Sequence, residues 1–97
     1  MSHGIGTIVS YGIPFKMVDS IQHYIEHGIL PGHFLAAVIS NELKQAVEHA
    51  DDENIHLLPN YVRFFYNEVP AECWGSRDIM AAWHLNKQRT ESISSID

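Results

Sequence analysis

Two histidines and one glutamate form the cluster best suited to chemistry, in the segment His23-Tyr24-Ile25-Glu26-His27. In a helix, His23 and His27 lie one turn apart on the same face, where two imidazoles could bind one metal ion. Glu26 could then polarise a water molecule on that metal. The pattern indicates a candidate metal-dependent hydrolase.

The order His-x-x-Glu-His resembles the inverted zinc-protease motif over five residues. Such enzymes are much larger proteins and need a third protein ligand, for which Glu48 and Glu53 are the candidates. Chance histidine pairs are expected because the chain has seven histidines in 97 residues. We therefore predict surface histidines and no metal or other cofactor, with His23, Glu26 and His27 as the alternative metal site.

The segment Cys73-Trp74-Gly75-Ser76 contains the only cysteine, so an intramolecular disulfide is excluded. A catalytic cysteine needs a positioned base and a lowered pKa, and nothing in the sequence requires His84 to lie beside Cys73. We predict that Cys73 and Trp74 pack the last loop against the core.

Aromatic residues gather in one short segment that includes Tyr61 and the run Phe64-Phe65-Tyr66. Consecutive residues of a helix point in different directions, so these rings cannot all face one core. Either helices on several sides cover the rings, or some rings form an interface, where tyrosine and tryptophan are enriched. The predicted binding surface consists of Tyr61, Phe64, Tyr66 and Trp74.

The composition indicates one acidic, globular domain. The net charge of −6, from 12 acidic and 6 basic residues, disfavours nucleic-acid binding, which needs a basic face. A helix-turn-helix is also disfavoured, because Lys44 would be the only basic residue of the recognition helix. No apolar run approaches the length of a membrane span, and the first residues do not form a signal peptide. We predict a cytoplasmic protein.

The first half of the chain predicts an extended arm followed by two helices. Residues 1–13 contain three glycines around a short β-branched run, which favours an extended arm or short strand. Apolar spacings of three and four predict a helix over residues 15–27, which Gly28 ends. A second helix of about 18 residues is expected after Pro31-Gly32, antiparallel to the first.

The second half predicts two further helical segments and a polar tail. The acidic residues 51–53 would begin a short helical turn, and Pro59 would begin a helix that reaches residue 68. The alternative is a single helix with a kink at Pro59. Ser76 is the expected N-cap of a short last helix. The expected organisation is an all-α bundle of three to four helices over residues 14–85, with a flexible polar tail at 86–97.

Several stretches are similar to segments of small helical proteins of tailed phages and prophages. The likeness extends over about two-thirds of the chain, excluding the first dozen residues and the tail, and five stretches carry it. They are YIEHGILPGHFL (24–35), NELKQA (41–46), ADDEN (50–54), FYNEVP (65–70) and CWGS (73–76). The resemblance implies an accessory factor that binds a host or phage macromolecule, and it implies no catalytic residue.

The function predicted from these observations is non-enzymatic protein binding. Its contact surface would be the aromatic helix together with the Cys73–Ser76 loop. Exposed aromatic side chains would also favour self-association, for which a symmetric dimer is the commonest arrangement.

Overall fold

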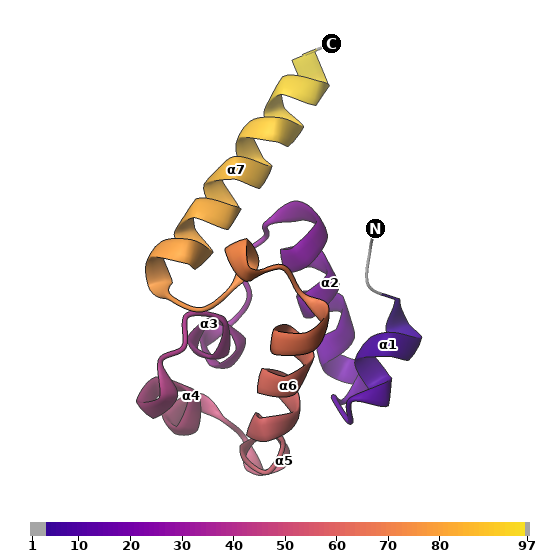
Figure 1. Ribbon diagram of the computed structural model, residues 1–97, viewed down its shortest axis with the longest axis vertical. Coiled ribbons are helices and arrows are strands. Elements are labelled where there is room, and N and C mark those ends of the chain that lie inside the picture. The colour runs from indigo at the N-terminus through magenta and orange to yellow at the C-terminus, as the bar shows by residue number, and fades with distance from the viewer. Residues whose placement is uncertain (1–3, 97) are drawn as a thin grey trace.

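The computed structural model describes the backbone of residues 4–96 and the side chains of residues 4–89. Over these residues the chain forms seven α-helices, two short 3-10 helices and no strand (Figure 1). The α-helices are α1 (Ile5–Ser10), α2 (Val18–His27), α3 (His33–Ile39), α4 (Leu43–His49), α5 (Asp52–Ile55), α6 (Leu58–Glu68) and α7 (Arg77–Ile96). The 3-10 helices are η1 (Phe15–Met17) and η2 (Ala71–Cys73). The all-α class is confirmed, but the helices outnumber the three to four expected.

The N-terminal segment is a helix, so the extended arm predicted for residues 1–13 is wrong over its described part. Residues 1–3 lie outside the described residues. Helix α1 buries Ile8 completely. Beyond its end, the Tyr11 hydroxyl donates a hydrogen bond to Glu68 Oε2 at 2.7 Å. A strand here would have no neighbouring strand to satisfy its backbone groups, whereas a helix satisfies them within itself.

Helix α2 ends at Gly28, as predicted. Gly28 has φ of 68°, a left-handed conformation that costs a glycine little. The Trp83 indole Nε1 of α7 donates to the Tyr24 carbonyl at 3.0 Å, and His84 Nδ1 lies 2.7 Å from the Gly28 carbonyl oxygen. A Cβ atom at Gly28 would lie only 2.6 Å from Lys87 Cβ. Gly28 therefore both ends α2 and lets α7 approach it closely.

The single 18-residue helix expected after Pro31-Gly32 is broken into α3 and α4 at Ser40 and Asn41. Asn41 has φ of 61°, a left-handed conformation that asparagine tolerates better than most residues. The Glu42 amide donates to the Ala37 carbonyl at 2.9 Å, which closes a Schellman-type end of α3. Asn41 therefore adopts the left-handed conformation that glycine commonly adopts at the ends of helices.

Three predicted helix starts are confirmed. Asp51 Oδ1 accepts a hydrogen bond from the Asn54 amide at 2.7 Å and so caps α5. Pro59 lies in the first turn of α6, where its missing N–H leaves no hydrogen bond unmade. Ser76 Oγ accepts from the Ile79 amide at 3.1 Å at the start of α7.

The core is built around four fully buried aromatic side chains, Tyr24, Tyr61, Phe64 and Phe65, and the nearly buried Phe34. Phe34 packs edge-on against Tyr61 at 5.3 Å, and Phe64 packs in the same way against Phe65 at 5.3 Å between ring centroids. Aliphatic residues from α1, α2 and α3 surround these rings. The largest fully buried side chains are Tyr24, Tyr61, Phe64, Phe65, Ile8, Ile13, Ile21, Leu35, Ile39, Val18 and Cys73.

Helix α7 is much longer than the short last helix expected, and Figure 1 shows it running from the body of the molecule into solvent. The flexible tail predicted for residues 86–97 is thus wrong for 86–96, which are helical, while residue 97 lies outside the described part. The sequence after residue 85 contains neither glycine nor proline to stop the helix. No helix among the described residues is long and apolar enough to cross a membrane.

Burial of α1 predicts a large difference between two neighbouring substitutions. Ile8→Ala removes a fully buried side chain and should lower the free energy of unfolding by about 2–5 kcal/mol. Val9→Ala, at an exposed position of the same helix, is the matched control and should cost less than about 1 kcal/mol. Urea denaturation followed by circular dichroism measures both. Equal effects of the two substitutions would contradict the docking of α1 on the core.

Candidate protein-binding site

The predicted aromatic surface is mostly internal. Tyr61, Phe64 and Phe65 are fully buried, so assigning Tyr61 and Phe64 to a binding surface is wrong. Tyr66 alone among these four residues is exposed, with 77% of its surface accessible. Helix α6 lies between helices on several sides, and those helices cover the three buried rings.

Trp74 is half-buried and packs against the outside of the core. Its ring lies 5.7 Å from that of Phe65, and Cys73 beside it is fully buried. The Cys73 carbonyl accepts a hydrogen bond from the Tyr24 hydroxyl at 2.7 Å. The loop thus packs against the core as predicted, which leaves Trp74 little free surface for a partner.

A shallow apolar hollow lies between α4 and α6, with α3 as its floor. Its volume is ≈ 40 Å³, about the size of one side chain. The apolar lining residues are Ala37, Val38, Leu43, Ala46, Leu58 and Val62. We refer to this hollow, together with the exposed Val47 and Tyr66 on its two flanking helices, as the α4–α6 groove.

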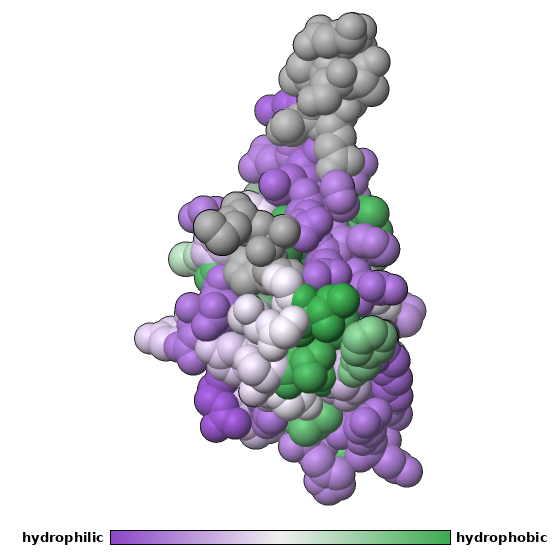
Figure 2. All heavy atoms as spheres, turned by 90° about the vertical axis from the view of Figure 1, so that its right-hand side faces the viewer, coloured by the Kyte–Doolittle hydropathy of each residue, from purple (hydrophilic) through white to green (hydrophobic). Residues whose placement is uncertain are grey.

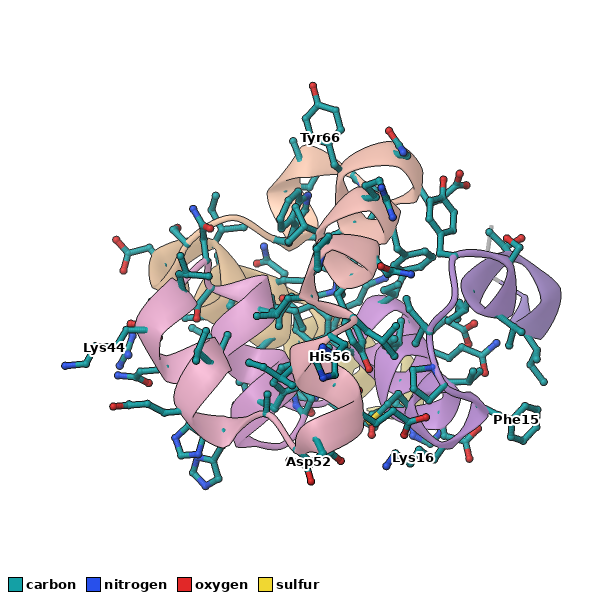
Figure 3. The ribbon with its side chains drawn as sticks, turned by 90° about the horizontal axis from the view of Figure 1, so that it is seen from below. Phe15, Lys16, Lys44, Asp52, His56 and Tyr66 are labelled. Carbon is teal, nitrogen blue, oxygen red and sulfur yellow. The ribbon has the colours of Figure 1, made fainter. Side chains whose placement is uncertain are left out.

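Large apolar side chains along this groove are exposed to solvent. Leu43 at the start of α4 is 70% exposed, and Val47 one turn later is also exposed. Val62 and Tyr66 lie one turn apart on α6, so they share one face of that helix. Figure 3 shows Tyr66 pointing away from the body, and Lys44 on the outer side of α4. Singly exposed apolar residues are common, whereas contiguous exposed apolar patches are typical of interaction sites, and two of these residues, Leu43 and Val62, line the hollow.

One end of the α4–α6 groove is polar. Arg77 Nη2 donates to Glu42 Oε2 at 2.6 Å, and the Ser40 hydroxyl donates to Glu42 Oε1 at 3.0 Å. These two donors, Arg77 first, hold the pKa of the Glu42 carboxyl below its usual value. The groove therefore has an Arg77–Glu42 ion pair at one end and apolar side chains along its length.

The opposite side of the molecule has a separate apolar area without a described hollow. Figure 2 faces α1, where apolar side chains gather on the surface. Ile5 and Val9 of α1 are both exposed. Phe15 is 71% exposed, and Figure 3 shows it pointing out on a different side from Tyr66. Phe15 is therefore a suitable control position for Tyr66.

The histidine pair lies on the surface of α2. His23 and His27 are exposed and Glu26 is half-buried, with His27 Nε2 4.0 Å from Glu26 Oε1. Glu53, one of the two proposed third ligands, instead pairs with Lys16 at 3.1 Å. Within the described part of the chain, no three His, Cys, Asp or Glu side chains are grouped closely enough to hold a metal ion.

A second hollow was not predicted, because its residues come from five separate helical elements. It has a volume of ≈ 330 Å³ and lies between η1, α2, α3, α5 and the end of α4. At its edge the His33 and His49 rings are stacked, 5.2 Å apart and inclined by 25°. Asp51, also in the lining, already accepts from the Asn54 amide and from Lys16 Nζ. This carboxylate is engaged in the fold and does not form an acid–base pair with the histidines.

No family model, curated protein or solved structure matches this chain. The resemblance to small phage and prophage proteins therefore stays a prediction.

The exposed positions of His23 and His27 predict that neither residue contributes much to stability. His23→Ala should change the free energy of unfolding by less than about 0.5 kcal/mol, the usual range for surface substitutions. The same protein, purified without an affinity tag, should contain no stoichiometric zinc. One tightly bound metal ion per chain, lost in the His23→Ala variant, would restore the hydrolase hypothesis.

The environment of Cys73 predicts an unreactive thiol. Burial raises the pKa of the Cys73 thiol to about 12, so the nucleophilic thiolate is scarce near neutral pH. Iodoacetamide should therefore alkylate the native protein very slowly and the urea-unfolded protein at the rate of a free cysteine. Mass spectrometry over time measures both rates. Rapid alkylation of the native state would instead indicate an accessible, activated cysteine.

Proposed function

We propose that this chain is a non-enzymatic protein-binding module whose contact surface is the α4–α6 groove. The observation that carries the proposal is the exposure of Leu43, which lines the hollow, and of Tyr66, one helical turn beyond the lining residue Val62. Removing such side chains from water stabilises a complex by roughly 1.5–3 kcal/mol each. A tyrosine ring adds a rigid apolar surface with a polar tip, which suits a contact that forms and dissociates.

The shape and charge of the groove favour an amphipathic, basic helix as the partner element. Two helices flank the hollow, and a third helix laid along such a groove places apolar side chains at every third or fourth position into it. The chain has a net charge of −6, whereas Glu42 at one end of the groove is already paired with Arg77, so the attraction for a basic partner comes from the acidic molecule as a whole. Basic residues flanking the apolar anchors of the partner would therefore speed its association.

The biological setting is part of the same proposal. We propose an accessory factor of phage or prophage type that acts in the cytoplasm on a protein and not on nucleic acid. The acidic composition supports the choice of partner, because nucleic-acid contacts require a basic face. The sequence resemblance described above supports the setting.

Site-specific photo-crosslinking tests the groove directly. Tyr66 is replaced by photoreactive benzoylphenylalanine in cells that make the protein, and Phe15 is replaced in a second strain as the matched exposed aromatic control. We expect a discrete protein adduct from position 66 and none of the same mass from position 15. Mass spectrometry of the adduct should show a basic amphipathic helix as the crosslinked segment.

A second substitution distinguishes specific binding in the groove from nonspecific hydrophobic association. Leu43→Asp places a charge at an exposed position across the groove from α6, so it should leave the fold intact and abolish the adduct from position 66. The corresponding control, Leu85→Asp on α7, should leave the adduct unchanged. No adduct at position 66, or one that survives Leu43→Asp, would contradict the proposed binding site.

A further inference from the structure

Helix α7 has one face on the body and another turned directly away from it. Trp83 and His84 contact the end of α2 through the hydrogen bonds described above, and Lys87 Nζ lies 4.9 Å from the centre of the Trp83 ring. These residues form the face of α7 that docks on the molecule. At about 100° per residue, the opposite face is centred on positions 78, 82, 85 and 89.

The outward face of α7 is a line of four exposed residues, Asp78, Ala82, Leu85 and Arg89. Their spacing of four, three and four residues keeps them in one stripe along the helix, as at the contact positions of a coiled coil. Leu85 is 61% exposed and is the large apolar residue of this stripe. Among the residues whose side chains are described, none forms an ion pair with Asp78 or Arg89.

This stripe is complementary to a second copy of itself that runs in the opposite direction. In an antiparallel pair of α7 helices centred between Ala82 and Leu85, Asp78 of each helix lies opposite Arg89 of the other. In the same register, the small Ala82 lies opposite the large Leu85. Opposite charges therefore meet at both ends of the contact, and a small residue meets a large one on each side of its centre.

We propose that the outward face of α7 is a homodimerisation surface, on which a second copy of the chain binds through its own α7 in antiparallel orientation. The two-fold axis of such a pair makes both copies use the same residues, as in most soluble homodimers. The bodies of the two copies lie on opposite sides of the helix pair, because each body occupies the far face of its own α7.

The size of this contact predicts weak and salt-dependent association. The two helices overlap over roughly 14 residues, about 20 Å, which buries less than the roughly 800 Å² per partner of a standard interface. The burial of Leu85 favours association, while the two charge pairs select the register and orientation. Because exposed charge pairs are screened by salt, raising the salt concentration weakens the dimer.

Complementary charge reversals test the register. Arg89→Glu places two acidic residues opposite each other at both ends of the pair, and Asp78→Arg places two basic residues there. Each variant alone is expected to sediment as a monomer at concentrations where the unaltered protein forms a dimer. In an equimolar mixture, each charge again meets an opposite one, so the mixed sample is expected to form a heterodimer.

Two further variants test the apolar contact at the centre of the stripe. Leu85→Asp should abolish the dimer, whereas Gln88→Asp adds the same charge on the flank of the helix and should retain it. Circular dichroism shows that each chain is folded before sedimentation. An unaltered protein that stays monomeric at all concentrations, a dimer that survives Leu85→Asp, or a mixture that does not associate would each overturn the proposal.

The dimer and the α4–α6 groove are separable by the same measurements. Leu43→Asp and Tyr66→Asp alter the groove and should leave sedimentation unchanged. Dimerisation that is lost with Tyr66→Asp but kept with Leu85→Asp would instead assign self-association to the aromatic helix and overturn the α7 contact.

Discussion

The fold depends on burying two tyrosine side chains, Tyr24 and Tyr61, whose hydroxyl groups must keep hydrogen bonds inside the protein. An unpaired buried hydroxyl costs about 1–3 kcal/mol, a large share of the stability of a domain this small. Tyr24 donates to the Cys73 carbonyl at 2.7 Å, and Tyr61 donates to Asn54 Oδ1 at 2.6 Å. Desolvation by burial raises the pKa of both phenols, so they remain neutral donors near neutral pH.

Each of these hydrogen bonds positions a helix whose outer face forms one of the two proposed contact surfaces. The hydrogen bond from the Tyr24 hydroxyl holds the η2 loop against the core. The Tyr24 backbone carbonyl accepts from the Trp83 indole, so the side chain and the backbone of Tyr24 together position the first part of α7. The Tyr61 bond joins α6 to α5 through Asn54, which is itself buried. With one side of α6 committed to the core in this way, Val62 and Tyr66 face out, and Val62 lines the hollow beside α4.

The parts of the fold that could be predicted are those determined by local backbone chemistry. Gly28, Asp51 and Pro59 act at helix ends for reasons that involve only their immediate neighbours. The break at Asn41 could not be predicted in the same way, because the apolar spacing continues through it and the left-handed residue is not glycine. The helical N-terminus was missed because the burial of Ile8 depends on contacts with distant helices.

The candidate site was predicted only in part, since exposure depends on how the helices pack together. Four adjacent aromatic positions can be recognised in the sequence, but which of them faces solvent depends on the helices around α6. Three became core and only Tyr66 stayed outside. The same reasoning applies to α7, where Leu85 could serve as a core residue until Trp83 and His84 are seen to occupy the body-facing side. An exposed apolar surface consists of the residues that are left over when the core is filled. The local sequence pattern therefore gives the candidate surface residues, and the packing of the helices decides which of them stay exposed.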